Sequence, residues 1–426
     1  VLAENVVISL EDARSGRVWQ ATNAQLVLRE RSDGVTVSVA SDLFNGTDDL
    51  SQVLLSLAFD DTTRETELGV RLENVPSNDI ALQSPALAWL SVLRSPISGA
   101  MRAQLSGNGT LESLNGTLDL EDGVLQPEGL VEPIRFQTAR AYFSFDPDRQ
   151  RLDFDEIGFQ SSDFRVTAAG HSYLSGTPDD WAASFVSQFD VTEAIVHTDE
   201  LFGAPVSIDR AQADLRLTLS PFRLEVANAF AQKEEVAARA VAEITVEEGL
   251  WNVDVDASTD TIHGGRVLEF WPTLVAPKTR KWLTERVIDG TLSDVSFGVR
   301  FVQGTKPEVS LSFDYHDAIV RYLDDMPVAQ DGAGRATIHN REFVIEIEKG
   351  WVPSGEGKRV NGAGSVFRVS DIRQKPPQGA LSIVAGGQLE SVLSVIDHPP
   401  LQLMERVGRT TDFATADTRV KASISM

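Results

Sequence analysis

Most of the chain alternates between apolar and polar residues with a period of two. Clear examples are residues 35–39 (VTVSV) and residues 309–313 (VSLSF). Short turn signals such as Ser32-Asp33-Gly34 separate these runs, which is typical of an antiparallel β-meander. Alternation of this kind makes one face of a sheet apolar and leaves the other face to water. The pattern therefore predicts a mainly β protein.

Three segments interrupt the alternation with a period near that of a helix. They are residues 84–94, 267–290 and 389–408. The first lies between Pro85 and Pro96 and is more apolar than a solvated helix should be. The sequence thus predicts three short amphipathic helical inserts in a long antiparallel sheet.

The central insert has the clearest helix signals. Pro277 suits a first helical residue, and Gly290 suits a helix stop. Between them, Trp282, Leu283 and Val287 recur at helical spacing. The preceding Phe270-Trp271-Pro272 is predicted to form a separate turn, because Pro272 and Pro277 would each break one continuous helix.

An isolated helix of about a dozen residues is marginal in water, so each insert must be held by packing. The nearest apolar surface without a cover is the sheet. We therefore expect the inserts to lie across or inside a groove in the sheet, with large apolar side chains directed at it. These side chains are Trp89 and Leu90 in the first insert, Trp282, Leu283 and Val287 in the central insert, and Leu403 in the third.

The inserts divide the chain into four predicted modules. They are an N-terminal meander at 1–83, an insert with its sheet at 84–266, the central insert with its sheet at 267–388, and the third insert with the next strand at 389–426. No linker rich in Gly, Ser or Pro separates the hairpins in between, so no firm domain boundary is predicted. Alternation is already in progress at Val1 and continues to Met426, which indicates a segment of a longer protein.

An amphipathic sheet must cover its apolar face, by closing into a barrel, by packing as a sandwich, or by curling into a trough. Three short helices are a small cover for a sheet of this length, which favours an open trough with an apolar groove. The residues predicted to line it are Leu215, Leu217, Leu219, Val309, Leu311, Phe313, Phe343, Ile345 and Ile347. Acyl chains suit such a surface, because each buried methylene contributes about 0.8 kcal/mol without needing a directional partner.

Composition excludes several classes of function. The 38 basic and 63 acidic residues give a formal charge of -25, which makes nucleic acid an unsuitable partner and disfavours adsorption to anionic bilayers. Cysteine is absent, so disulfides and thiolate metal sites are excluded. No run approaches the roughly 20 apolar residues that span a bilayer. The sequence calls for no cofactor and leaves the oligomeric state open.

Candidate catalytic chemistry is confined to one polar cluster. Asp314 and His316 share a face of a predicted strand, near Asp317, Asp324 and Asp325, and two such side chains could bind a metal or pair a base with a carboxylate. The simpler interpretation is that they form the solvent face of a strand whose other face is apolar. No nucleophile elbow, phosphate loop or His-Glu-x-x-His spacing occurs. We therefore predict no catalytic residue, no metal site and no enzymatic activity.

Three cations stand in the first turn of the central helix. Lys278, Arg280 and Lys281 oppose the helix dipole there, at roughly 0.3–1 kcal/mol each when exposed. They could contact a lipid headgroup at the groove rim, or they could simply be solvated beside carboxylates such as Glu285 and Asp289.

The motifs around the central insert resemble a known family. Phe270-Trp271-Pro272, residues 276–283 (APKTRKWL), Gly290 and residues 322–327 (YLDDMP) are similar to the AsmA-like superfamily of Gram-negative bacteria, and most of all to its YhdP-type branch. The order of motifs agrees from about Leu68 to Met426. The resemblance implies a periplasmic protein anchored in the inner membrane by an N-terminal helix, with a β-sheet curled around an apolar groove. It implies phospholipid transport toward the outer membrane and provides no catalytic residues.

Three functions follow as hypotheses. The first is a segment of a periplasmic bridge between the inner and outer membranes, which carries phospholipid acyl chains along the groove and reaches both membranes through parts of the full-length protein outside this chain. The second is a structural or adhesive β-rod, either a β-helix or a sandwich array, without a lipid lane. The third is a carbohydrate-processing enzyme on a β-helix, which would show carboxylates converging in a cleft.

Overall fold

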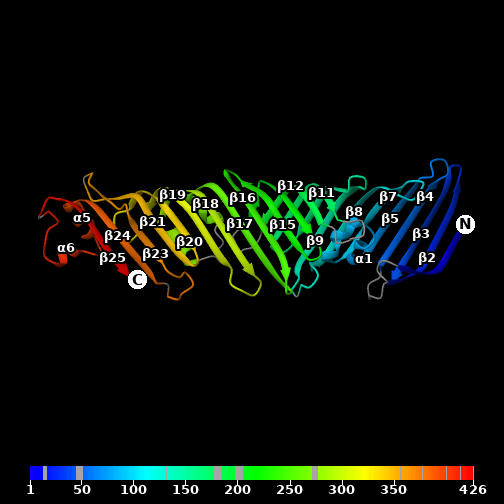
Figure 1. Cartoon of the computed structure of the whole chain (residues 1–426), viewed down its shortest axis with the longest axis horizontal. Coiled ribbons are helices and arrows are strands. Elements are labelled where there is room, and N and C mark those ends of the chain that lie inside the picture. Colours follow the sequence, from blue (N-terminus) through cyan, green and yellow to red (C-terminus); the bar gives the residue numbers. More distant parts are fainter. Residues whose placement is uncertain are drawn as a thin grey trace. The chain divides into compact units, whose positions relative to one another are not determined.

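The computed structural model describes residues 1–12, 17–44, 51–130, 132–176, 184–196, 205–270, 277–355, 357–376, 378–399, 401–412 and 414–425. The strands in these ranges belong to one antiparallel sheet (Figure 1). The predicted fold class, mainly β with an antiparallel sheet and a few short helices, is confirmed. The antiparallel pairings also differ from a β-helix, whose strands are parallel.

The strands follow one another through short connections. The first fourteen are β1 (Leu2–Asp12), β2 (Arg17–Arg31), β3 (Gly34–Phe44), β4 (Ser51–Asp60), β5 (Thr66–Pro76), β6 (Leu93–Arg94), β7 (Pro96–Leu105), β8 (Leu111–Leu125), β9 (Ile134–Asp146), β10 (Arg151–Gln160), β11 (Phe164–Ser175), β12 (Ser184–Val196), β13 (Val206–Ile208) and β14 (Arg210–Thr218). The remainder are β15 (Arg223–Lys233), β16 (Val236–Glu247), β17 (Leu250–His263), β18 (Val287–Val302), β19 (Glu308–Val320), β20 (Ala329–His339), β21 (Glu342–Pro353), β22 (Arg359–Asn361), β23 (Ser365–Val369), β24 (Gly379–Gln388) and β25 (Asp417–Ser425).

The chain divides into two compact units. Unit 1 comprises Val1–His197, Ser207–Ala231 and Val241–Asn252, and unit 2 comprises Thr198–Val206, Gln232–Ala240 and Val253–Met426. Each of β15, β16 and β17 therefore contributes residues to both units. The division falls within hairpins, where the sequence carries no linker. The four modules drawn at the inserts stay a prediction.

Helices occur at all three predicted inserts. The first contains the 3-10 helix η1 (Pro85–Val92), the central one contains α3 (Val267–Phe270) and α4 (Pro277–Arg286), and the third contains α5 (Leu389–Ile396) and α6 (Leu403–Arg406). Two further elements precede the predicted bounds: α1 (Ser77–Ala81) before the first insert and the 3-10 turn η2 (Gly264–Arg266) before the central one. None of the helices in the described ranges is long and apolar enough to cross a bilayer. Residues 271–276 lie outside the described ranges, and with them Trp271 and Pro272 of the predicted turn.

Two predicted helix details are wrong. Helix α4 begins at Pro277 as predicted but ends at Arg286, and Val287 already belongs to β18 rather than to a helix that stops at Gly290. The first insert is a 3-10 helix with five buried residues, Ala86, Leu87, Ala88, Leu90 and Val92, instead of an amphipathic α-helix. A helix that is covered on most sides is also apolar on most sides, so it lacks the solvent-exposed polar face of an amphipathic helix.

Candidate functional site: an apolar inner face

In unit 2, cross-strand pairing gathers the apolar side chains on one face of the sheet. Leu311 pairs with Phe297 and Ile338, and Ile345 pairs with Ala336 and Phe367. Directly paired residues place their side chains on the same face. We call this face the inner face of unit 2, and its register members from β18 to β24 are Phe297, Val299, Val309, Leu311, Phe313, Ala336, Ile338, Phe343, Ile345, Phe367, Val369 and Leu381.

The intervening residues form a polar outer face. Ser312 pairs with Ser296 and Thr337, while Asp314 pairs with Arg335, whose Nε donates a 2.6 Å hydrogen bond to Asp314 Oδ1. That hydrogen bond holds the pKa of the Asp314 carboxyl below its usual range. Asp314 is therefore an ion-paired surface carboxylate, and the residues that the structure describes contain no cluster of three or more metal-ligating side chains.

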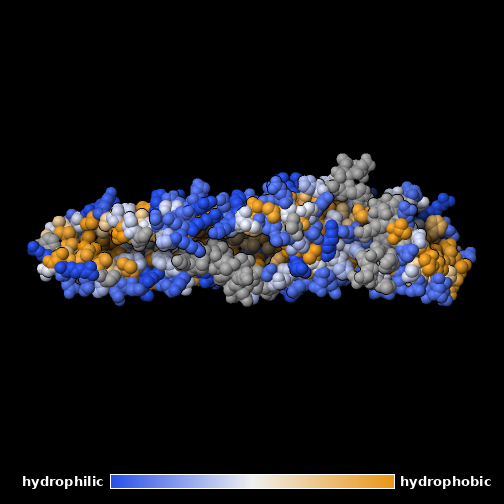
Figure 2. Space-filling model, turned by 90° about the horizontal axis from the view of Figure 1, so that it is seen from below, coloured by the Kyte–Doolittle hydropathy of each residue, from blue (hydrophilic) through white to orange (hydrophobic). Residues whose placement is uncertain are grey.

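The inner face of unit 2 is partly open to solvent. Apart from the buried Ala336, its register members are half-buried. None of those members is charged. Over the strands of unit 2, Figure 2 shows hydrophobic residues in a recess between hydrophilic margins. A surface of this kind can hold hydrocarbon, because it presents apolar area and leaves no buried charge to desolvate.

Unit 1 has an inner face of the same kind, and one row of paired residues crosses it from β2 to β14. The row is Leu28, Val37, Leu57, Leu68, Ala103, Leu114, Phe145, Leu152, Ser172, Ser187 and Leu215. Leu28 and Leu57 are 37% and 38% exposed, whereas Leu114 is 7% and Leu152 is 0% exposed. The same row is thus open at β2–β4 and covered at β8–β10.

The cover is the first helical insert. Leu87 and Leu90 of η1 belong to one buried cluster with Leu118 and Leu152 of the sheet. The Trp89 and Phe154 rings meet edge to face with centroids 6.2 Å apart. Leu90 is fully buried and Trp89 is half-buried. Of the side chains predicted to pack on the sheet, these two therefore contact it directly.

Hydrogen bonds hold the insert at both ends. Ser77 Oγ donates to Leu93 O at 2.8 Å, Ser95 Oγ donates to Glu121 O at 3.0 Å, and Ser77 N donates to Ser95 O at 3.0 Å. Ser77 and Ser95 are themselves buried. These contacts close the base of the insert, so the insert is a fixed part of the unit 1 core.

Leu215, Leu217 and Leu219 lie on the same strand side of β14 and the turn after it. Leu215 and Leu217 are half-buried, and Leu219 is buried in the unit 1 cluster with Phe222 and Trp251. Leu215 and Leu217 pair with Ser187 and Phe185. Ser187 and the neighbouring Ser172 are buried on the inner face, and their hydroxyls satisfy each other at 2.6 Å.

Several aromatic rings lie flat over glycines of the adjacent strand. A β-carbon at Gly116 would lie 2.7 Å from Phe143 Cζ, and one at Gly334 would lie 2.8 Å from the Tyr315 hydroxyl oxygen. The Tyr315 side chain extends across Gly334, and its hydroxyl donates a 3.0 Å hydrogen bond to Glu346 O. A ring that lies over a glycine packs against the sheet and does not project from the inner face. The sequence alone did not predict these pairs. Their signal is a strand glycine directly opposite an aromatic residue.

Among the described residues of the central insert, polar contacts hold the end of α4. Arg286 forms hydrogen bonds of 2.5 and 3.2 Å with the two carboxylate oxygens of Asp324, and Arg321 N donates to Arg286 O at 2.8 Å. The contact with Arg286 lowers the pKa of Asp324. Trp282 is 40% exposed, and Leu283 and Val287 are half-buried. Trp282, which is predicted to point at the sheet, is thus not deeply buried.

The proposed headgroup cations of this insert are partly engaged within it. Arg280 Nη2 donates to Leu268 O at 3.3 Å, and the Lys281 ammonium lies 3.7 Å from Glu285 one turn later. The Lys278 side chain lies outside the part that the structure describes. Pairing with Glu285 fits the simpler of the two interpretations for Lys281.

The third insert covers a small cluster in unit 2. Val392 and Val395 of α5 are buried with Met326 and Val360. Leu403 of α6 is 43% exposed, whereas the adjacent Met404 is buried. The helix thus packs through the residue next to the one singled out in the sequence, because a shift of one position rotates a helical side chain by about 100°.

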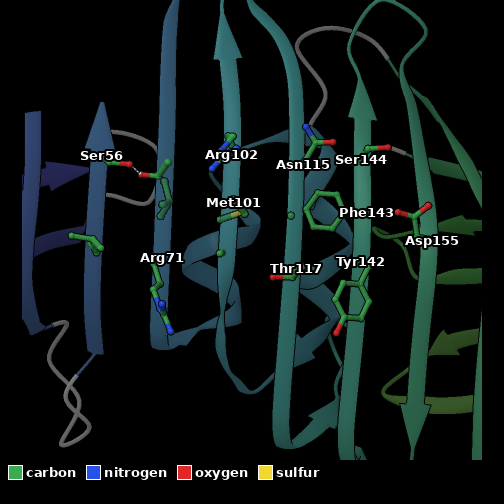
Figure 3. A pocket seen from close by; sticks show the side chains of 15 residues that line it. Ser56, Arg71, Met101, Arg102, Asn115, Thr117, Tyr142, Phe143, Ser144 and Asp155 are labelled. Atoms are coloured by element: carbon green, nitrogen blue, oxygen red, sulfur yellow. Dashed lines mark hydrogen bonds between the residues drawn. The ribbon is translucent and has the colours of Figure 1, made fainter. Parts of the chain in front are cut away.

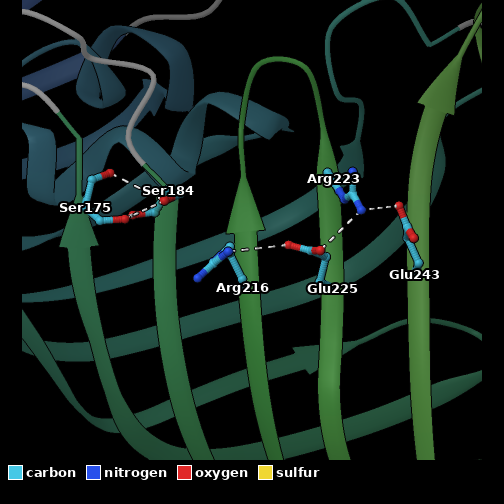
Figure 4. Close-up of polar contacts among 6 residues, drawn as sticks. All are labelled: Ser175, Ser184, Arg216, Arg223, Glu225 and Glu243. Carbon is cyan, nitrogen blue, oxygen red and sulfur yellow. Dashed lines mark hydrogen bonds and ion pairs between the residues drawn. The ribbon is translucent and has the colours of Figure 1, made fainter.

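Ion pairs cross the outer face of unit 1. Arg216 lies 4.0 Å from Glu225, Arg223 lies 3.2 Å from Glu225, and Arg223 also lies 2.9 Å from Glu243 (Figure 4). Such exposed pairs contribute little stability each. Their main effect is to keep the outer face hydrophilic from β14 to β16.

A shallow depression also lies on this outer face. Figure 3 shows Arg71, Arg102, Thr117 and Tyr142 around it. Arg102 lies 2.9 Å from Glu67, and Arg71 lies 3.7 Å from Glu73. Paired, exposed arginines and an open floor provide no enclosed site, so the inner face remains the candidate functional surface.

Sheet and inner face together define a class of protein that presents an extended apolar surface to hydrocarbon. The family model described as YhdP protein matches residues 60–426. The chain therefore belongs to the YhdP family, an AsmA-like family of lipid transport proteins. No curated protein and no solved structure matches the chain significantly.

Proposed function

We propose that this chain is a segment of a periplasmic bridge that carries phospholipid acyl chains along its inner faces from the inner to the outer membrane. The observation that carries the proposal is the uncharged, half-open inner face of unit 2. The full-length protein is proposed to be anchored in the inner membrane. The chain acts as a carrier and not as an enzyme.

Apolar burial supplies the binding energy for the acyl chains of a sliding lipid. Each methylene placed on the inner face contributes about 0.8 kcal/mol, and successive rows of Val, Leu, Ile and Phe offer equivalent positions. Equivalent positions allow movement, because the burial free energy lost on leaving one row is regained on the next. The polar outer face keeps the same sheet soluble in the surrounding water.

The test uses two neighbouring residues on opposite faces. Leu311→Glu places a carboxylate on the inner face, and Ser312→Glu is the matched control on the outer face. An isolated carboxylate against hydrocarbon is costly, but in an open trough water can still reach it. We expect Leu311→Glu to lose most co-purifying phospholipid, measured by native mass spectrometry and lipid extraction, while Ser312→Glu keeps it and both variants retain their melting temperatures.

Two results would contradict the proposal. Wild-type lipid content in Leu311→Glu would show that the inner face of unit 2 does not hold the lipid. Absence of lipid from the wild-type chain, together with global unfolding of Leu311→Glu, would indicate a packed interior and favour the structural rod.

A further inference from the structure

Three hairpin tips of unit 2 lie side by side at one edge of the sheet. They connect β18 to β19, β20 to β21, and β23 to β24, and antiparallel pairing of these strands places all three at the same strand ends. Two hydrogen bonds join them: Arg373 Nη2 donates to Pro307 O at 2.6 Å, and Ile372 N donates to Arg341 O at 2.9 Å. We call this group the hairpin edge.

The three hairpin tips carry four basic residues, namely Lys306, Arg341, Arg373 and Lys375. The nearby carboxylates are already engaged. Glu342 pairs with Arg368 at 2.6 Å, Asp371 Oδ1 accepts from Arg373 N at 2.8 Å, and Glu308 lies 3.6 Å from Arg341. Among the described residues, Lys306 and Lys375 have no carboxylate partner. Free cations at one edge are notable in a chain whose formal charge is -25.

Arg341 also adopts a backbone conformation that favours glycine. Its φ is 69°, after φ 48° at Asn340, as in the two-residue hairpin turns that usually carry Asn-Gly. A long side chain in this conformation costs free energy that glycine would not. Backbone strain of this kind concentrates at functional positions, and here it directs an arginine to the edge.

The inner face begins directly beside these cations. Phe343 follows Arg341 by two residues, and Val309 follows Lys306 by three. At about 3.3 Å per residue, the basic and apolar positions are about 7–10 Å apart along the strands. That spacing matches an amphiphile, whose phosphate and first methylenes are adjacent. Ile372, 41% exposed, adds an apolar side chain at the same tips.

The geometry points to a phosphate site: the hairpin edge binds the phosphate headgroup of a phospholipid whose acyl chains lie on the inner face of unit 2. This inference rests on the proposed function and assigns the headgroup to the edge opposite α4. Lys and Arg bind phosphate oxygens through charge-assisted hydrogen bonds. The overall negative field would repel an anionic lipid, so any preference for phosphate must arise locally.

The experiment compares two soluble lipids with the same acyl chains. Dioctanoylphosphatidylglycerol carries a phosphate and dioctanoylglycerol does not, and calorimetric titration gives the affinity of the chain for each. We expect phosphatidylglycerol to bind about tenfold more tightly, the effect of a few exposed charges together. The variant Lys306→Gln/Arg373→Gln/Lys375→Gln should abolish that preference and leave the affinity for dioctanoylglycerol unchanged.

A matched control removes the same charge from hairpin tips of unit 1. Arg31→Gln/Arg64→Gln/Arg149→Gln should bind both lipids like the wild type. Equal wild-type affinities for the two lipids, or an unchanged preference in the hairpin-edge variant, would overturn the headgroup site while the acyl-chain proposal stands. Binding of inorganic phosphate as tightly as phosphatidylglycerol would assign the edge to free anions and overturn it too. Failure of both lipids to bind the wild type would overturn the proposed function and this inference together.

Discussion

Leu57 and Leu152 occupy the same row of the unit 1 inner face and differ only in what covers them. Leu57 is 38% exposed on β4, whereas Leu152 on β10 is fully buried in the cluster that also contains residues of the first insert. Identical side chains on one continuous row thus face different surroundings. The row changes from a partly exposed apolar surface to a packed core over a few strands.

Truncation of these two leucines should affect the free energy of unfolding to different extents. Leu152→Ala is expected to lower the free energy of unfolding by about 2–5 kcal/mol, because it leaves a cavity in a packed cluster. Leu57→Ala should cost about 1 kcal/mol or less, since its surroundings already admit water. Urea titration followed by circular dichroism measures both. Equal costs would show that the insert does not cover β10 in solution.

Tyr315 offers a test through pH. Burial raises the pKa of its hydroxyl to about 12. The unfolded chain releases this proton near the ordinary value of about 10, so the folded state loses stability as the pH rises from about 10 to 12. Tyr315→Phe should remove that part of the alkaline loss and cost about 0.5–1.5 kcal/mol at neutral pH through the missing hydrogen bond to Glu346 O. Parallel alkaline denaturation curves for the two proteins would contradict the assignment.

At the scale of elements, the three inserts differ in how they are held. The first is buried in a large cluster, the third covers a small cluster, and α4 is tied by Arg286 to Asp324 while Trp282 stays 40% exposed. Truncation of Trp282 is therefore expected to cost less than the about 3–5 kcal/mol of a fully buried aromatic residue. Similar sequence patterns have thus produced one insert that is buried in a large core and two inserts that make smaller contacts.

Replacement of the first insert should lengthen the open inner face of unit 1. Pro76 and Pro96 pair across β5 and β7, so residues 77–95 can be replaced by Asn-Gly to close a short hairpin. The variant should carry more phospholipid per chain because sheet residues that contact the insert, such as Phe154, become accessible, and it should be less stable. Native mass spectrometry counts the lipid, and circular dichroism checks the fold.

A milder variant protects this test against misfolding. Trp89→Ala removes the contact with Phe154 and keeps the insert, so it should raise lipid content by a smaller amount. Folded variants with unchanged lipid content would show that the covered rows do not accept acyl chains.

At the scale of the whole molecule, the net charge is expected to disfavour adsorption to an anionic membrane surface without preventing the uptake of single lipids. The formal charge of -25 repels anionic bilayers, and the apolar residues of the inner faces alternate with polar ones that face water. We therefore expect the protein to take up individual lipids and not to coat a membrane.

Sedimentation with vesicles checks this expectation. Vesicles of phosphatidylglycerol at about 0.15 M salt should leave the chain in the supernatant, because local cations at the hairpin edge are too few to offset the overall repulsion. The single-lipid titrations should nevertheless show binding. Strong co-sedimentation with intact vesicles would instead indicate a membrane-coating protein.

Local patterns in the sequence determined the class of fold and the two faces of the sheet. Alternation at residues 309–313 already separates Leu311 from Ser312, because the side-chain period of a strand depends only on neighbouring residues. The positions of the three inserts and the helix start at Pro277 were also predictable, since proline and glycine act locally. The match to the YhdP family agrees with the resemblance carried by the motifs around the central insert.

Only the tertiary structure decided which parts of the inner face are open and which charges meet. The contact between Trp89 of η1 and Phe154 of β10 joins residues more than fifty positions apart in the chain, and the hairpin edge joins Pro307 to Arg373 across 66 residues. The burial of Leu90 and the exposure of Trp282 likewise depend on whether a large cluster lies beneath the helix. A helical pattern predicts that one side must pack, but the amount of apolar surface available to it is set by strands far away in sequence.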